Sequence, residues 1–289
     1  MKVFVTGASG QLGRELCRQL GRAAVPSYHD LLDVTNASAV RAALRTERPQ
    51  VVVNCAAYTQ VDRAESEPAP CRAVNAMAVA HLAETCSDLS CSLLQISTDY
   101  VFTGNTPLGR PYTEHDRPVP CGVYATTKYE GERAAAHCRH WIVRTCGLYA
   151  RPEHTEAHNF VRTILRLAEA GSPLRVVADQ HCTPSYVPHV ARAICFLIGA
   201  DGPAAPFGLY HVVNGGATTW YDFACELLQQ AGQTTAIEPI TTAQYAARAP
   251  RPAYSVLDTS AYKALGGPVL PEWRTALTEY ISEHRILNH

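Results

Sequence analysis

Lysine is scarce in this chain. Only Lys2, Lys128 and Lys263 occur, so nearly all of the 25 basic side chains are arginines. The 25 basic and 26 acidic residues almost cancel, and the formal net charge is −1 at pH 7. A protein that binds nucleic acid or an anionic membrane surface usually carries a clear excess of basic charge. The composition therefore argues against both kinds of partner, and it makes the position of each lysine informative.

Disulfide patterns and long apolar runs are also missing. The eleven cysteines are odd in number, their spacings are irregular, and no C-x-x-C motif occurs, so free thiols in a reducing compartment are expected. The longest apolar run, near Ala193–Ile198, is far too short to span a bilayer. The chain enters a β-prone run directly after Lys2, without a signal-peptide pattern. These absences predict a soluble, cytoplasmic protein.

What the sequence does contain is a regular alternation of β-prone apolar runs and helical segments. Strands are predicted at 3–5, 24–28, 51–54, 92–97 and 141–145, and helices at 11–20, 36–44, 71–87 and 124–137. This alternation predicts an α/β protein with a Rossmann-like, doubly wound parallel sheet. Beyond residue 149 the pattern is mixed. Helices are expected at 159–170, 222–230 and 271–284, and another follows the turn at 183–188 and ends at 198. We expect a first domain over 1–146, to which part of about 186–215 returns, and a smaller, mixed α/β cap over 147–289.

The first strand and helix are joined by a glycine-rich turn. Gly7, Gly10 and Gly13 follow the apolar run 3–5, and Leu12, Leu16 and Leu20 then recur on one helix face. Glycines allow a sharp turn and a close approach of the backbone to a pyrophosphate, whose charge the free N–H groups at a helix start attract. A plain strand–turn–helix connection would show the same three glycines. Their place in a strand–turn–helix unit favours a dinucleotide cofactor.

Tyr124 and Lys128 lie four residues apart on one predicted helix face. A phenol is a poor acid at neutral pH, and a nearby cation is expected to favour its phenolate. The pair is suited to passing a proton to a carbonyl oxygen while a hydride reaches the carbon. The alternative is a surface tyrosine beside a solvated lysine.

Polar residues close the predicted strand 92–97. Ser97, Thr98, Asp99 and Tyr100 stand at its carboxyl end, where open α/β sheets bind their ligands. A hydroxyl group there can hydrogen-bond a substrate carbonyl as charge develops on its oxygen. An ordinary strand-to-loop turn would use the same residue types to satisfy backbone donors.

Several motifs, in this order and spacing, resemble a known family. They are GASGQLG, LDVTN, VVVNCAAYTQVDRAESEP, STDYVF, YATTK, NFVRTILRLA, VVADQHCTPSYV, LYHVVNGGATTWYDFA and RPAYSVLDTS. Together they resemble the extended short-chain dehydrogenases/reductases, and among these the dTDP-4-dehydrorhamnose reductase family. The resemblance covers nearly the whole chain and implies that the first domain binds NAD(P) and the cap binds the substrate.

The resemblance also implies roles for individual residues. Thr98, Tyr124 and Lys128 correspond to the catalytic triad. The cofactor-binding set would be Gly7, Gly10, Gln11, Leu12, Gly13, Asp33, Val34, Ala57, Tyr58, Thr59, Tyr124 and Lys128. The substrate contacts would be Thr98, Asp99, Tyr100, Asn159 and Arg251, with Arg251 on the nucleotide diphosphate. By its own sequence context Asp33 fits a turn or helix start equally well, and Arg251 fits a solvated loop.

The chain departs from the family pattern at a few positions. Gly147 stands where the family usually has a tryptophan that stacks on the sugar, and Tyr149 or Tyr186 could supply another aromatic ring. Cys182 replaces a usual glycine. Tyr28 lies near the place where an acidic residue often selects NADH, and no clear basic clamp for a 2′-phosphate is present, so the cofactor is expected to be NADPH or NADH. No cluster of side chains has metal-site spacing.

The function implied is reduction of the 4-keto group of a nucleotide-activated deoxysugar, dTDP-4-dehydro-L-rhamnose above all. A homodimer is also among the expectations. Two alternatives stay open: a nucleotide-sugar epimerase that keeps NAD bound, and a non-catalytic, NADP-binding regulatory subunit. A dehydratase would carry an acid–base Asp-Glu pair after the threonine, and here Asp99 is followed by Tyr100.

Overall fold

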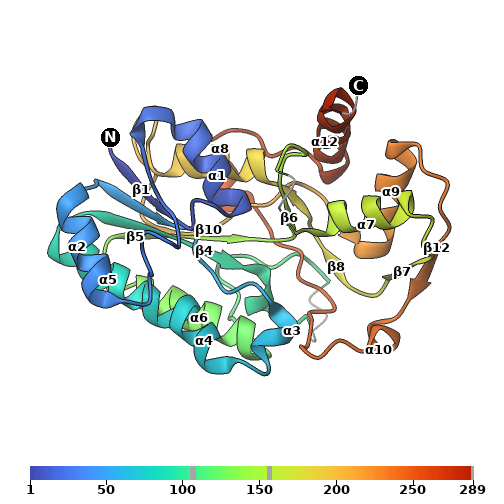
Figure 1. Ribbon diagram of the computed structural model, residues 1–289, viewed down its shortest axis with the longest axis horizontal. Helices are drawn as coiled ribbons and strands as arrows, with labels where there is room; N and C mark the ends of the chain where they lie inside the picture. The colour runs from blue at the N-terminus through green and yellow to red at the C-terminus, as the bar shows by residue number, and fades with distance from the viewer. Residues whose placement is uncertain (105–108, 155–157, 288–289) are drawn as a thin grey trace.

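Six parallel strands form the central sheet, in the order β10–β5–β4–β3–β1–β2. The computed structural model describes residues 1–104, 109–154 and 158–287. The strands are β1 (Val3–Thr6), β2 (Ala24–Ser27), β3 (Val51–Asn54), β4 (Ser92–Thr98), β5 (His140–Thr145) and β10 (Gly208–His211). Strand order runs outward in both directions from β1 and β3, which places a crevice at their carboxyl ends. The predicted fold class is confirmed (Figure 1).

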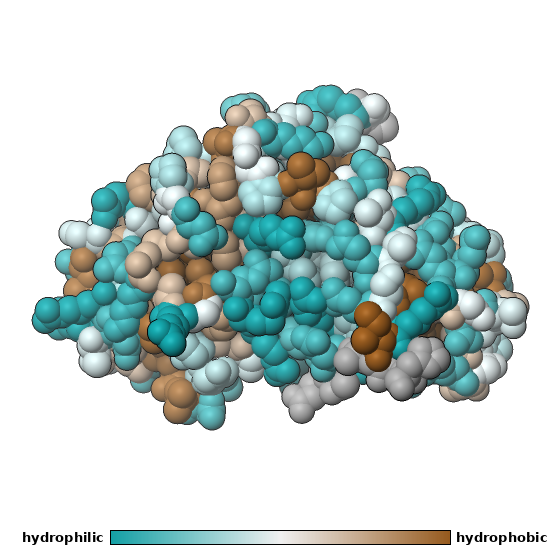
Figure 2. All heavy atoms as spheres, turned by 90° about the horizontal axis from the view of Figure 1, so that it is seen from above, coloured by the Kyte–Doolittle hydropathy of each residue, from teal (hydrophilic) through white to brown (hydrophobic). Residues whose placement is uncertain are grey.

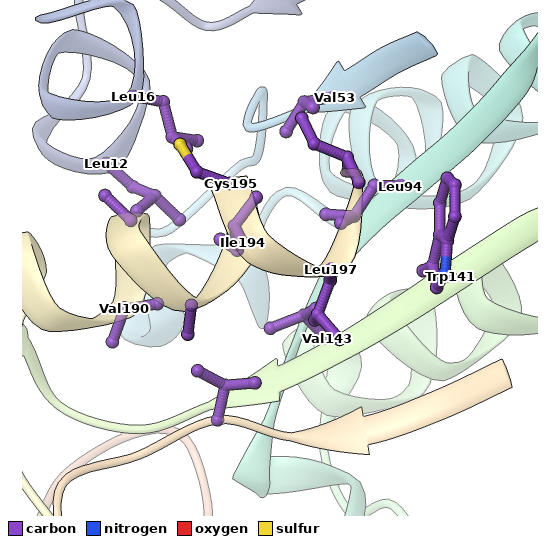
Figure 3. Packing of buried hydrophobic residues seen from close by; sticks show 14 of the residues in the cluster. Leu12, Leu16, Val53, Leu94, Trp141, Val143, Val190, Ile194, Cys195 and Leu197 are labelled. Atoms are coloured by element: carbon purple, nitrogen blue, oxygen red, sulfur yellow. The ribbon is translucent and has the colours of Figure 1, made fainter. Parts of the chain in front are cut away.

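Both faces of the sheet are apolar, because successive residues of the central strands alternate between them. One face packs against α1 (Gln11–Leu20) and α8 (Val187–Leu197), through a cluster that includes Leu12, Leu16, Val53, Leu94, Trp141, Val143, Val190, Ile194 and Leu197 (Figure 3). The other face packs against α2 (Ala37–Glu47), α5 (Ala78–Asp88) and α6 (Val123–Ala135), through Phe4, Val40, Leu44, Val52, Leu82, Leu93, Ala135 and Ile142. The helices therefore cover the sheet on both sides, as Figure 1 shows.

Two elements of this layered half come from late in the chain. Strand β10 pairs with β5, from Gly208 opposite Trp141 to His211 opposite Arg144. Helix α8 contributes Val190, Ile194 and Leu197 to the cluster beneath α1. One edge of the sheet and one covering helix are thus supplied after the chain has passed through the cap.

The cap has a core of its own, drawn at the right of Figure 1. Its helices are α7 (Phe160–Glu169), α9 (Trp220–Ala231) and α12 (Trp273–Leu287), with the short helices α10 (Thr242–Tyr245) and α11 (Ser260–Ala264) in the same part of the chain. Its strands form three pairs: β7 (Leu174–Val177) with β12 (Ile237–Ile240), β6 (Leu148–Tyr149) with β9 (Ser185–Tyr186), and β8 (His181–Cys182) with β11 (Thr218–Thr219). Small two-stranded pieces and helices replace the regular alternation there.

The segment predicted as one helix over 71–87 is divided by a π-helical turn. It consists of α4 (Pro68–Arg72), the turn η2 (Ala73–Met77) and α5. The turn buries Asn75 against α6, where a side chain at Gly131 would come within 2.2 Å of the Asn75 carbonyl oxygen. Such turns often occur at functional sites. Here the turn aims the Asn75 amide at Tyr58, in the loop after β3.

The remaining short elements are η1 (Gly21–Ala23), α3 (Val61–Ala64) and η3 (Asp99–Val101). All eleven cysteines are free thiols.

Within the described ranges, no helix combines the length and apolar character needed to cross a membrane. Seen from above, apolar residues gather over the left half, which holds the sheet, and polar residues cover most of the rest (Figure 2).

Candidate active site

A cavity of about 750 Å³ opens at the carboxyl ends of β4 and β5, beside the turn that follows β1. The sheet half and the cap both line it. Eleven of the predicted site residues lie in its wall: Gly10, Gln11, Leu12, Gly13, Ala57, Thr59, Thr98, Asp99, Tyr100, Tyr124 and Lys128. A second hollow, of about 620 Å³ between α1, α8 and the 200–206 segment, contains none of them. The first cavity is therefore the candidate active site.

The glycine turn forms one end of this cavity. Gly7 has a left-handed φ of +62°, and a Cβ there would lie 2.7 Å from the backbone nitrogen of Ala56. A Cβ at Gly13 would lie 2.3 Å from the Gly7 carbonyl oxygen, so neither position accepts a side chain. Helix α1 begins after Gly10, and no side chain in the described part of the chain caps it. Its first N–H groups thus remain for an anion, and the exposed Arg14 lines the same part of the cavity.

Two buried polar atoms of the cavity wall also have no hydrogen-bond partner among the described residues. Among the described residues, nothing hydrogen-bonds Thr145 Oγ1 or His154 Nδ1, and both residues line the cavity. Unpaired buried polar atoms are costly, and a bound polar ligand would relieve that cost. Together with the uncapped helix, they fit a dinucleotide lying from the glycine turn toward the ends of β4 and β5.

Other predicted cofactor residues lie outside the cavity wall. Tyr58 donates its backbone N–H to Asn75 Oδ1 (2.9 Å) and its hydroxyl to Glu67 (2.7 Å), while its neighbours Ala57 and Thr59 face the cavity. Asp33 is exposed and accepts hydrogen bonds from the N–H and hydroxyl of Thr35, which is the turn role that its sequence context also allowed. Val34 is buried beside it. The adenine contacts assigned to Asp33 and Val34 stay predictions.

Lys128 lies on the cavity floor and is only 4 % exposed. Its Nζ donates to the Ile96 carbonyl oxygen at 2.6 Å. Burial lowers the pKa of Lys128 to about 8, and the nearby Glu132 opposes this shift. The ammonium group therefore exchanges its proton close to physiological pH.

Tyr124, one helical turn before Lys128 on α6, meets Thr98 in the same cavity. Burial raises the pKa of the Tyr124 phenol above its usual range, and a hydrogen bond with the Thr98 hydroxyl lowers it in part. In the ligand-free protein burial therefore outweighs the effect expected of a neighbouring cation, and that expected effect stays a prediction. The phenol keeps its proton, which is the form that an acid needs. The ring of Tyr100 meets that of Tyr124 edge-on at 5.8 Å.

Asp99 is buried beside the same hydroxyl groups. It accepts hydrogen bonds from Thr98 Oγ1 (3.2 Å) and from the Ser255 hydroxyl. Burial raises the pKa of the Asp99 carboxyl above its usual value. The hydrogen bonds of Asp99 with Ser255, Cys146 and Thr98 offset this rise only in part. A connected row of polar groups thus runs from Asp99 through Thr98 to Tyr124.

A buried ion pair behind the lysine was not expected from the sequence. Arg144 on β5 binds both carboxylate oxygens of Glu132 on α6, at 2.8 and 2.7 Å, and Ser97 donates to the same carboxylate. His211 lies 3.5 Å from Arg144. Burial, and to a smaller extent the positive charge of Arg144, lowers the pKa of His211 to about 3. The position of Glu132, four residues after Lys128 on α6, could have placed a carboxylate near the lysine, but it gave no sign of Arg144.

Two predicted substrate residues bind other protein groups. Asn159 caps α7 and donates to Gln11 Oε1 (2.9 Å), so it ties the cap to the glycine turn. Arg251 is not a solvated loop residue, because its guanidinium binds both carboxylate oxygens of Asp62, at 3.0 and 2.7 Å. That contact lowers the pKa of Asp62 to about 2. Neither Asn159 nor Arg251 lines the cavity, and their substrate contacts stay predictions.

The cap end of the cavity contains an aromatic residue that sequence reasoning missed. Tyr149 and Tyr186, the predicted replacements for the absent tryptophan, stack on each other at 5.3 Å in the buried cap core and do not line the cavity. Trp220 lines it instead, beside Gly147. The motif TTWYDFA contained this tryptophan, but only the fold brings it next to residue 147. Across the described parts of the chain, no group of three or more His, Cys, Asp or Glu side chains could hold a metal ion.

Comparison with known proteins fits this geometry. The family model described as "RmlD substrate binding domain" matches residues 1–286. A dTDP-4-dehydrorhamnose reductase of Streptomyces griseus is 45% identical over 284 residues, which cover 96% of this chain and 91% of the relative. The chain belongs to the dTDP-4-dehydrorhamnose reductase family.

Two further relatives of this family bear on ligand choice. A probable dTDP-4,6-dihydroxy-2-methyloxan-3-one 4-ketoreductase of Streptomyces antibioticus is 40% identical, with 96% of this chain and 94% of the relative covered. The crystal structure of dTDP-4-dehydrorhamnose reductase from Bacillus anthracis in complex with NADP superimposes with a TM-score of 0.90 at 35% identity. The match covers 98% of this chain and 100% of that one.

Proposed function

We propose that this protein reduces the 4-keto group of a dTDP-activated deoxysugar with NADPH or NADH, converting dTDP-4-dehydro-L-rhamnose to dTDP-L-rhamnose. The observation that carries the proposal is the meeting of Thr98, Tyr124 and Lys128 on the floor of one cavity whose far end is an uncapped helix start. The names of the related enzymes support the choice of a dTDP-sugar.

Each of these side chains has a distinct part in the reduction. The Thr98 hydroxyl and the protonated phenol of Tyr124 hydrogen-bond the keto oxygen, and the phenol donates its proton as negative charge develops there. The ammonium of Lys128 stabilises the phenolate that remains. When bound, the nicotinamide supplies the hydride. Ser9, the glycine turn and the N-terminus of α1 would hold the phosphates of the dinucleotide. Ala57 and Thr59 would contact the dinucleotide between its phosphates and its nicotinamide.

The same geometry supports a division of labour along the chain. Residues 1–146, with α8 and β10, would bind the cofactor, and most of 147–289 would shape the sugar end of the cavity. The partner that we propose is the nucleotide-sugar substrate. The homodimer stays a prediction, which sedimentation can test.

The test is oxidation of NADPH with enzymatically prepared dTDP-4-keto-6-deoxysugars, compared with the same sugars on UDP and GDP. Turnover with the dTDP-sugar, and its loss in Tyr124→Phe, is the expected result. Purified protein that carries stoichiometric, non-exchangeable NAD and inverts a sugar carbon without consuming NADPH would identify an epimerase. Reversible NADPH binding without turnover, together with a stable co-purifying protein, would identify a regulatory subunit.

A further inference from the structure

The backbone at Gly147 leaves a space that Trp220 fills. Gly147 follows β5 with a left-handed φ of +51°. A Cβ built there would lie 2.9 Å from Trp220 Cη2 and 3.1 Å from the Cα of Pro184. No side chain fits at position 147 while the indole keeps its place. The glycine and the tryptophan therefore form one complementary pair, although 73 residues separate them in the sequence.

The protein holds the indole firmly at this point. Trp220 is the first residue of α9, whose N-cap Thr219 exchanges hydrogen bonds with Asp222 (3.0 and 2.8 Å). The two residues before it pair with β8, so that Thr218 lies opposite Cys182. The indole packs against the ring of Phe160 at 4.7 Å. Its position is thus fixed by helix, strand and aromatic contacts before any ligand arrives.

The cavity that Trp220 lines combines the apolar indole with polar groups. Asp99, Gln180, His181 and Ser255 line the same cavity, and they offer hydrogen-bonding groups to hydroxyls. A 6-deoxyhexose matches this combination, because it has hydroxyl groups, a methyl group and a face of C–H bonds that can pack on an aromatic ring. A nucleotide diphosphate, with its charge, would be poorly served by an indole.

We propose that Trp220 is the apolar wall of the hexose subsite, and that the Gly147–Trp220 pair sets which sugar face the enzyme accepts. This inference rests on the proposed function, since it assigns the sugar of that substrate to one end of the cavity. Trp220 acts here as a specificity-determining residue, while Thr98, Tyr124 and Lys128 perform the proton transfer.

The chain offers a spectroscopic signal for this contact. It has three tryptophans, and two of them, Trp141 and Trp273, are each 2 % exposed in cores away from the cavity wall. Trp220 is the one that lines the cavity. A change in tryptophan emission when a dTDP-sugar binds should therefore come from Trp220.

The experiment compares dTDP-L-rhamnose with dTDP on the wild type, Trp220→Ala and Trp220→Phe, with Trp273→Phe as the matched control. Calorimetry gives the Kd values, fluorescence follows the indole, and thermal melts verify folding. We expect Trp220→Ala to raise the Kd of dTDP-L-rhamnose about 2- to 12-fold, the worth of an aromatic contact, and to leave that of dTDP unchanged. In turnover the KM should rise more than kcat falls. The emission change should persist in Trp273→Phe and vanish in Trp220→Phe. Trp220→Phe retains an aromatic ring, so it provides this test even if Trp220→Ala does not fold.

The outcomes separate the two proposals. If the wild type binds both ligands but Trp220→Ala weakens the binding of both equally or of neither, the assignment of Trp220 is wrong and the proposed function stands. An emission change that survives in Trp220→Phe has the same meaning. If the wild type binds neither dTDP nor dTDP-L-rhamnose, the proposed function fails, and the sugar subsite fails with it.

Discussion

The activity of this protein should fall as the pH rises through about 8, because Lys128 loses its proton there. The ammonium group is buried on the cavity floor, where it donates a hydrogen bond to the carbonyl oxygen of Ile96. Burial disfavours the charged form and lowers the pKa of Lys128 from its usual 10.5 to about 8. Glu132 limits this loss, since its negative charge favours the ammonium.

The size of the effect follows from the titration curve. At about pH 7 roughly nine-tenths of the Lys128 side chains carry the proton, and at about pH 9 roughly one-tenth do. Because the phenolate left by Tyr124 needs this cation, kcat/KM should fall about tenfold between these two pH values.

The assay is kcat/KM for NADPH at a fixed, saturating concentration of the dTDP-sugar, since this quantity reports ionisations of the cofactor-free enzyme. Lys128→Arg is the control, because a guanidinium keeps its charge throughout the range and the variant should show no break near pH 8. A wild-type profile that stays flat to about pH 9.5 would refute the reasoning, as would a break that persists in Lys128→Arg.

Four other predictions can be tested alongside. Tyr124→Phe should lower kcat by about 10²–10⁴, the worth of a positioned acid, with an unchanged Kd for NADPH in fluorescence titrations; retained activity would point to another acid. NADPH and NADH should give kcat/KM values within about tenfold of each other in parallel assays, and a larger gap would reveal a discriminating side chain. Gly147→Trp should collide with Trp220 and lose dTDP-sugar binding in calorimetry, which Trp220→Ala in the same chain should partly restore; normal binding by the single variant would contradict the packing. His211, neutral in the fold down to about pH 3, takes up a proton near pH 6.5 when unfolded, so stability present above about pH 6.5 is lost as the pH falls, by up to about 1.4 kcal/mol per pH unit. Urea melts should show a shallower loss in His211→Asn, whose amide can still donate to the backbone, and an equal loss would assign the dependence to other groups.

The sequence was sufficient for the sheet because its signals are local. The runs around Val52 and Leu94 are apolar on both faces, as buried parallel strands must be, and the glycines after β1 mark a turn that tolerates no side chain. The catalytic floor was equally accessible, since Tyr124 and Lys128 are one helical turn apart.

The contacts that sequence reasoning missed are formed between different helices, strands and loops. Arg144 reaches Glu132 from a neighbouring strand, and Trp220 reaches Gly147 because β11 pairs with β8. Periodicity cannot report such pairs, because they depend on how the chain returns rather than on the residues beside them. The phenol of Tyr124 illustrates the same limit: its pKa is set by burial, which the spacing to Lys128 does not reveal.

The late arrival of α8 and β10 has a consequence for how the protein is made. A ribosome releases the N-terminal half first, yet that half cannot complete its sheet edge or cover the face under α1 until residue 211 has emerged. Leu12, Leu16 and Val143 remain without their α8 partners during that interval. We therefore expect the sheet half to complete its fold only late in synthesis, and the nascent chain to expose until then an apolar surface that chaperones can bind. For the same reason the two halves cannot be exchanged as independent modules, because cutting the chain between them removes part of the first.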